Sequence, residues 1–338
     1  MFYISCCKEA FYITQSKPVI AVEEHFVIEE LDSFKDEDPN GPHAKAVAPI
    51  MNRLKNLGDN RIAEMDEAGV AKQIVSLTAP GTQQLERDEA IQLSTKANNL
   101  LGEAVQKHPE RLAGFATLPT IEPKLAAQEL ERTVNEFGFK GAIINGHTLG
   151  EYLDHPKFEI IFEKAEQLNV PIYLHPAIPP DNVIDTYYKG NYSSDVAMQF
   201  ASAGWGWHIE TAIHLIRIVL SGTFDKYPDL KIVTGHNGEG VLYALQRLDT
   251  LIPPQLSHLK KKVSDYLKEN IYYSIFGYTY APPFMQMYEQ VGADHILYSS
   301  DYPYVSMKDT LDFVDQLDIS EEDKDKILYK NAQQLFNL

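Results

Sequence analysis

Eight short apolar runs alternate along the chain with longer stretches of helical periodicity, and this order constrains the fold more than any other feature. In stretches such as 87–107 and 123–137, apolar residues recur at steps of three and four, as in an amphipathic helix. Apolar strands joined by helices are typical of a parallel sheet that is covered on its outer face. The predicted strands are 19–22, 73–77, 112–118, 141–144, 171–174, 231–234, 271–275 and 295–299. Eight βα units predict an α/β fold, a closed (β/α)8 TIM barrel, with an open doubly wound sheet as the alternative.

A chain of 338 residues is long enough for one large barrel or for two ordinary domains. No Pro- or Gly-rich linker divides it, so we predict a single barrel domain over residues 17–338, preceded by an N-terminal extension at 1–16. Long insertions follow the first and fifth predicted strands, at 29–58 and 176–222. Insertions at this end of a barrel commonly build the rim of the active site.

The charge balance excludes several classes of partner. Acidic residues outnumber basic ones by 48 to 30, and the net charge of −18 repels nucleic acid and anionic membranes at long range. No segment is long and apolar enough to span a bilayer. Cys6 and Cys7 are the only cysteines, and adjacent cysteines rarely form an unstrained disulfide, so we expect a reducing, cytoplasmic location.

Four side chains that can bind a metal follow the first, fifth and eighth apolar runs. Glu23 and His25 are two residues apart, so on a strand they point to one face while Glu24 points to the other. His175 and Asp301 end the other two runs, although Asp301 could simply cap a following helix. Because barrel active sites form where the strands end, we predict one shared site for a divalent metal. Two carboxylates and two imidazoles suit Zn²⁺ or Mn²⁺.

A second pair, His236 and Glu239, follows the sixth predicted strand. Their spacing places Glu239 in the first helical turn, where its carboxylate can orient the imidazole for acid–base catalysis. The alternative is a core histidine and a glutamate that only favours a helix N-terminus. In the second insertion, Glu210 and His214 have i,i+4 spacing, which favours a structural hydrogen bond over a second metal.

Several strings of residues resemble the metal-dependent decarboxylases of the amidohydrolase superfamily, which include γ-resorcylate, 2,3-dihydroxybenzoate and 5-carboxyvanillate decarboxylases. The resemblance runs from about residue 18 to the C-terminus. Its matching strings are AVEEHF at 21–26, RIAEMD at 61–66, YLHP at 173–176, GH at 235–236 with GEG at 238–240, and SDYP at 300–303.

The resemblance implies that Glu23, His25, His175 and Asp301 hold one divalent metal, Zn²⁺ or Mn²⁺, with no organic cofactor. It also implies that His236 and Glu239 are the adjacent catalytic pair. Hydrolases of the superfamily begin with His-x-His at the first strand, whereas Glu23 occupies the first of these positions here, as in the aromatic-acid decarboxylases. The stretch 141–145 has no lysine to bridge two metals, which favours a mononuclear site.

The resemblance implies non-oxidative decarboxylation of a hydroxylated aromatic acid of the hydroxybenzoate type, in the catabolism of aromatic compounds. Direct loss of CO₂ would leave an aryl anion, so an acid must protonate the ring carbon, and we assign that role to Asp301. The first alternative is a metal-dependent hydrolase of a lactone or an amide on the same barrel. A second alternative is an inactive barrel kept as a metal-binding scaffold.

Three further residues are predicted to bind the substrate. Arg247 matches a family arginine and could clamp a substrate oxygen, and Arg61 could reach the site from its own or a neighbouring subunit. For Arg61 a capping contact or a structural ion pair is the favoured alternative, and for Arg247 the alternative is a solvated helix arginine or a salt bridge. Phe26 is a candidate for the pocket wall, as are Trp205 and Trp207. The family suggests a homodimer or a homotetramer.

Overall fold

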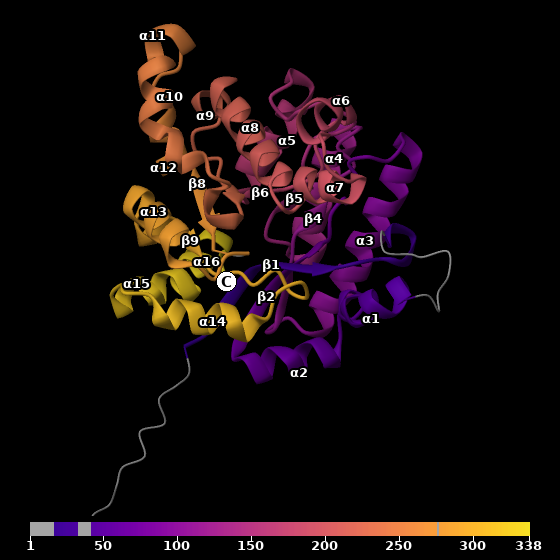
Figure 1. The fold of residues 1–338 in the computed structure, drawn as a ribbon. Coiled ribbons are helices and arrows are strands. Elements are labelled where there is room, and N and C mark those ends of the chain that lie inside the picture. Colours follow the sequence, from indigo (N-terminus) through magenta and orange to yellow (C-terminus); the bar gives the residue numbers. More distant parts are fainter. Residues whose placement is uncertain (1–16, 33–41, 276) are drawn as a thin grey trace, which may run out of the picture.

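Parallel strands lie at the centre of the molecule and helices surround them (Figure 1). The structure is a computed structural model that describes residues 17–32, 42–275 and 277–338. The predicted extension at 1–16 and part of the first predicted insertion lie outside the described residues. The strands are β1 (Val19–Phe26), β2 (Val70–Leu77), β3 (Leu112–Gly114), β4 (Ala116–Thr117), β5 (Ala142–Asn145), β6 (Ile172–His175), β7 (Ile232–Thr234), β8 (Ile271–Ser274) and β9 (Ile296–Leu297).

Two parallel ladders, β1-β2-β3 and β4 to β9, join into one barrel. β3 and β4 are two halves of one predicted strand, interrupted at Phe115, whose N–H donates to Val75 O at 2.9 Å. On the other side the Val22 N–H donates to Tyr298 O at 3.1 Å, which joins β1 to the end of β9. The predicted (β/α)8 barrel is therefore confirmed, and the open sheet is excluded.

The longer helices cover the barrel in the predicted βα order (Figure 1). The predicted helices at 87–107 and 123–137 are confirmed as α3 (Arg87–Lys107) and α4 (Pro123–Phe137). The others are α1 (Pro42–Leu54), α2 (Asp59–Ala68), α5 (Glu159–Leu168), α6 (Asp181–Val183), α7 (Ser194–Ala201), α8 (Gly206–Leu220), α9 (Thr223–Lys226), α10 (Leu245–Leu251), α11 (Pro254–Ser257), α12 (Val263–Glu269), α13 (Ala281–Val291), α14 (Met307–Gln316), α15 (Glu321–Asp325) and α16 (Asn331–Phe336). None of the helices in the described part of the chain has the length and apolar character that a bilayer span requires.

The apolar core has an inner and an outer layer. The outer layer lies between strands and helices and includes Ala21 and Phe26 of β1. The inner layer includes Ile20 and Val22 of β1, and Phe336 of α16 packs into it. The C-terminal helix thus closes one end of the barrel with apolar side chains, and the polar residues of β1 lie further along the strand, toward the other end.

Candidate metal centre

A bulge in β1 determines which of its polar side chains enter the barrel. Ala21 pairs with Gln73 of β2, but the next pairing joins Glu24 to Val75, so β1 carries one extra residue between these points. An extra residue in one strand shifts the alternation of its side chains. Glu23 therefore follows Val22 on the inner side, and Glu24 is turned outward as predicted.

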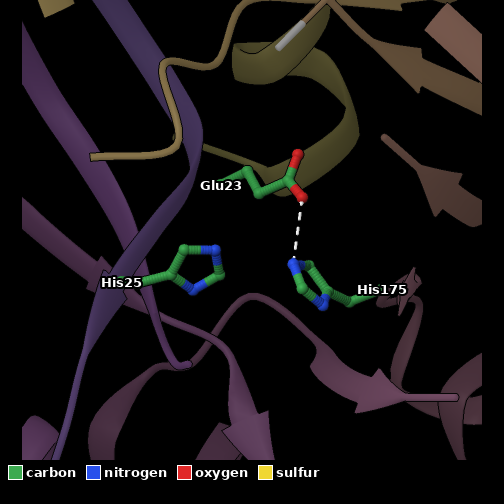
Figure 2. Close-up of side chains that lie close together, drawn as sticks. All are labelled: Glu23, His25 and His175. Atoms are coloured by element: carbon green, nitrogen blue, oxygen red, sulfur yellow. Dashed lines mark ion pairs between the residues drawn. The ribbon is translucent and has the colours of Figure 1, made fainter. Parts of the chain in front are cut away.

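The inward side chains of β1 meet His175, which ends β6 (Figure 2). One ligand-type atom from each of Glu23, His25 and His175 lies within 4.8 Å of the other two. His175 Nε2 is 3.5 Å from Glu23 Oε1, and His25 Nε2 is 3.0 Å from Asp301 Oδ1. The structure thus brings all four predicted ligands together at the same end of the barrel.

Hydrogen bonds orient both imidazoles so that Nε2 faces the cluster. The Nδ1–H of His175 donates to Pro176 O at 2.9 Å, which leaves Nε2 as the unprotonated nitrogen. His25 Nδ1 lies 3.2 Å from Ser76 Oγ, and this hydroxyl can itself donate to Glu24 O. This pattern, with one ring nitrogen held by an outer partner and the other turned inward, is typical of metal-binding histidines.

The charges of the cluster lack a positive partner among the described residues. Burial, and then the charge of Asp301, raise the pKa of Glu23 well above its ordinary value, although Tyr173 and Ser274 donate hydrogen bonds to the carboxylate. Burial likewise raises the pKa of Asp301 well above its usual range and lowers the pKa of His25 to about 3. A bound divalent cation would stabilise the charged form of both carboxylates and so lower their pKa values again.

Two buried atoms support the assignment of the cluster to a metal. Glu23 Oε1 makes no hydrogen bond within the described part of the chain, and the unprotonated His25 Nε2 faces only the Asp301 carboxylate, which is itself a candidate ligand, although both atoms are buried. Buried polar atoms without a partner are rare, and here they face a common point together with His175. The donor set of oxygen and nitrogen atoms, without thiolate, fits Mn²⁺ or Zn²⁺.

Asp301 lies in a tight turn after β9 and does not cap a helix. Its φ angle is 57°, in the left-handed region that non-glycine residues seldom adopt. The next helix, α14, begins six residues later and is capped by Ser306, whose side chain accepts from the Asp309 N–H. The helix-cap alternative for Asp301 is therefore wrong, because the turn directs the carboxylate toward His25 instead.

His236 and Glu239 form a hydrogen-bonded pair, with His236 Nδ1 2.6 Å from Glu239 Oε1. The predicted helical turn around Glu239 is wrong: residues from His236 to Gly240 all have positive φ angles, and helical structure resumes at Val241. The reason is the pair of glycines at 238 and 240, which allow a left-handed turn. Strained conformations of this kind are common at functional sites.

His208 of α8 also contacts Glu239, and it was not among the predicted site residues. Its Nδ1 is 2.7 Å from Glu239 Oε2, and its Nε2 is 3.1 Å from Ala203 O. The Glu239 carboxylate and the Ala203 carbonyl can only accept hydrogen bonds, so both ring nitrogens of His208 carry a proton and its imidazole is positively charged. Burial opposes this charge, but Glu239 raises the pKa of His208 above its ordinary value. The only sequence signal for His208 was its position in the second insertion.

Together the two histidines keep Glu239 ionised. Burial acts against ionisation, yet the bonds and charges of His236 and His208 hold the pKa of Glu239 below its usual range. Burial lowers the pKa of His236, so this imidazole is neutral and donates its Nδ1–H to Glu239. His236 Nε2 is then the basic nitrogen of the pair.

The three predicted substrate-binding residues lie outside these clusters. Arg61 is fully buried behind β1, where it donates hydrogen bonds to His25 O and to Gln73. These contacts are structural, but both acceptors are neutral, and Arg61 forms no ion pair with any described residue. Phe26 belongs to the outer core layer, on the opposite face of β1 from His25. Arg247 is exposed on α10, in the arm formed by α10 and α11 (Figure 1), and makes no hydrogen bond or ion pair with any described residue.

Of the remaining residues predicted in the second insertion, Glu210 and His214 have structural partners, Trp207 is partly buried and Trp205 faces solvent. Glu210 accepts a hydrogen bond from Tyr152, and His214 Nε2 accepts from the Leu153 N–H at 2.9 Å. Both residues therefore hold α8 against the segment after β5, in agreement with a structural role. Trp205 is 51% exposed.

An α/β barrel with two carboxylates and two imidazoles at one end of its strands defines a metal-dependent barrel enzyme. Residues 42–338 match the amidohydrolase family. A γ-resorcylate decarboxylase from Polaromonas sp. is 37% identical over 94% of this chain and 98% of its own length.

Two solved structures extend the comparison. A dihydroxybenzoic acid decarboxylase from Polaromonas sp. with bound manganese and the inhibitor 2-nitroresorcinol has a TM-score of 0.86 and 36% identity, over 95% of this chain and 97% of that one. A 5-carboxyvanillate decarboxylase from Novosphingobium aromaticivorans, complexed with manganese and 4-hydroxy-3-methoxy-5-nitrobenzoic acid, has a TM-score of 0.86 and 35% identity, over 96% and 97%. The chain belongs to the amidohydrolase family and, within it, to the decarboxylases of aromatic acids. The predicted class of enzyme, a carboxy-lyase, is confirmed.

Proposed function

We propose that this protein removes CO₂ from a hydroxylated benzoic acid without oxidation, with one divalent metal held by Glu23, His25, His175 and Asp301. The observation that carries the proposal is the convergence of these side chains at one end of the barrel. Manganese in the two related structures supports Mn²⁺ as the metal, with Zn²⁺ as the alternative. A bound divalent metal supplies a Lewis acid for the carboxylate and the neighbouring phenol oxygen.

Asp301 is the proposed acid. Its turn directs the carboxyl group toward His25, into the cluster where the substrate carboxylate would bind. In the reaction, Asp301 donates a proton to the ring carbon that bears the carboxylate, the bond to the carboxylate carbon breaks, and its electron pair returns to the ring. CO₂ and the neutral phenol, which carries the new C–H bond, leave, and Asp301 regains a proton from solvent.

His236 is the proposed partner of the phenolic oxygen. Glu239 fixes its orientation through Nδ1, and the charged His208 keeps Glu239 ionised. The neutral imidazole can therefore accept a phenolic proton at Nε2 and return it.

The substrate roles of Phe26 and Arg247 stay predictions, because nothing in the chain's own contacts tests them. For Arg61 the buried bonds to His25 and Gln73 favour a structural role. A homodimer or homotetramer, a cytoplasmic location and the absence of an organic cofactor also stay predictions.

The test is product analysis with the Mn²⁺-loaded protein. A panel of hydroxybenzoates that carry the hydroxyl next to the carboxylate is incubated with the protein, and CO₂ and the phenol product are measured. We expect stoichiometric CO₂ and phenol from at least one member. Hydrolysis of a lactone or an amide without CO₂ release from any hydroxybenzoate would show that the hydrolase alternative is correct.

A further inference from the structure

We infer that Glu24 is a positioning residue that holds the Asp301 turn against β1 and thereby sets the geometry of the metal site. This inference rests on the proposed function, since it concerns the same site. Glu24 faces away from the cluster, so it does not contact the metal or the substrate itself. Its side chain is nevertheless fully buried.

The carboxylate of Glu24 binds the residues on both sides of Asp301. Glu24 Oε1 accepts the Ser300 N–H at 2.9 Å, and Oε2 accepts the Tyr302 N–H at 3.1 Å. The Ser300 hydroxyl adds a third bond at 2.8 Å to Oε2. One side chain therefore fixes the peptide groups that flank the proposed acid.

The backbone of β1 reinforces this contact. The His25 N–H donates to Tyr302 O at 2.8 Å. Two consecutive residues of β1 therefore bind the same turn, Glu24 through its side chain and His25 through its peptide group. Asp301 itself has a φ angle of 57°, a conformation that costs about 1 kcal/mol or more for a non-glycine residue. Such a conformation persists only where the surroundings enforce it, and Glu24 supplies two of the enforcing bonds.

Arg61 and Gln73 connect the Glu24 carboxylate to the other side of His25. Gln73 Nε2 donates to Glu24 Oε2 at 3.3 Å, and Arg61 Nη1 donates to Gln73 Oε1 at 3.1 Å. The second terminal nitrogen of Arg61 donates to His25 O at 2.5 Å, and its guanidinium lies 4.7 Å from the Tyr302 ring centroid. The chain of contacts thus connects His25 to the Asp301 turn behind the metal site.

The partners of Glu24 require an acceptor on both carboxylate oxygens, because three of them are N–H donors. In Glu24→Gln, an NH₂ group would face an N–H donor, so one flank of Asp301 would be released.

The test measures Mn²⁺ affinity rather than turnover. Mn²⁺ is added in steps to three metal-free proteins: the wild type, Glu24→Gln and Glu129→Gln. The concentration of free Mn²⁺ is measured by electron paramagnetic resonance. Glu129 is a matched control, because it is a largely buried carboxylate on α4 that also accepts several hydrogen bonds, from Asn98 and Arg132. We expect Glu24→Gln to lose affinity by about tenfold or more, as for other outer partners of metal ligands, and Glu129→Gln to bind as wild type does.

The outcomes separate the inference from the proposed function. If the wild-type protein binds no Mn²⁺, the proposed function fails. If it binds Mn²⁺ and Glu24→Gln binds equally well, or if both variants lose affinity to the same extent, Glu24 has no positioning role. Should Glu24→Gln not fold, Ser300→Ala removes only the hydroxyl bonds: a loss of about threefold or more supports the inference, and wild-type affinity overturns it.

Discussion

Asp301 combines two proposed roles at one carboxylate, as a metal ligand and as the proton donor. Its placement by a left-handed turn puts the carboxylate beside His25. A substitution at Asp301 can therefore test proton donation separately from substrate binding.

Asp301→Asn should bind substrate but lose turnover. The amide keeps the size of the side chain and one oxygen, yet it cannot donate a proton as a carboxylic acid does. We expect kcat to fall by about 10²- to 10⁴-fold, the usual contribution of a positioned acid. CO₂ release is measured at matched Mn²⁺ occupancy, and turnover close to wild type would remove Asp301 from the chemical step.

His214 predicts a pH dependence of stability that is independent of the metal site. Burial, followed by the charge of His147, lowers the pKa of His214 to about 3 from the ordinary 6.5. Below pH 6.5 the unfolded chain therefore binds a proton that the folded protein excludes. This one group makes the free energy of unfolding decrease by about 1.4 kcal/mol per pH unit as the pH falls toward 3.

His214→Gln can still accept the Leu153 N–H and has no proton to gain. Urea unfolding of the wild type and the variant at several pH values between 7 and 5 should show a shallower decline for the variant. Parallel curves would mean that His214 is not held neutral in the folded protein.

At the scale of elements, periodicity predicted the strands and helices because it reports burial on one face. The ends of α3 and α4 agree with the prediction to the residue. The bulge in β1 was not predictable, since Glu23 to Phe26 reads as regular alternation and the extra residue appears only in the pairing with β2. His208 was missed for a related reason. Its partner, Glu239, is distant in sequence, and the turn that carries Glu239 is not helical.

The turn from His236 to Gly240 allows a matched pair of substitutions. Gly238 and Gly240 have φ angles of 81° and 78°, so alanine strains the backbone at both, by about 1 kcal/mol. A Cβ at Gly238 would also lie 2.9 Å from the Tyr273 ring, whereas one at Gly240 meets no atom within 4 Å. Gly238→Ala should therefore be less stable in urea than Gly240→Ala and should reduce CO₂ release more. Equal effects would show that contact with Tyr273 does not constrain this turn.

The apolar packing that stabilises the barrel and the polar clusters of the proposed site lie at opposite ends of the barrel axis. Apolar side chains fill one end, where Phe336 of the C-terminal helix packs on Phe115 with ring centroids 5.5 Å apart. The polar clusters occupy the other end. A net charge of −18 gives no general attraction for an anionic acid, so the local metal site has to capture it.

Phe336→Ala should therefore lower stability and leave catalysis intact. The side chain is 2% exposed, and its loss from a packed core costs about 3–5 kcal/mol. Leu100→Ala on α3 is the control, because that side chain is 43% exposed and its removal should have a much smaller effect. Urea unfolding measures the first effect, and kcat under native conditions measures the second. A lowered kcat in folded Phe336→Ala would show that the two ends are coupled.

The central claim is that a single metal, held by Glu23, His25, His175 and Asp301, supports decarboxylation. The most direct test adds Mn²⁺ in steps to metal-free protein and follows CO₂ release from a hydroxybenzoate substrate. We expect no CO₂ release without metal, a linear rise as Mn²⁺ is added, and saturation at one Mn²⁺ per chain. Full activity in the metal-free protein, or saturation only at two equivalents, would contradict it.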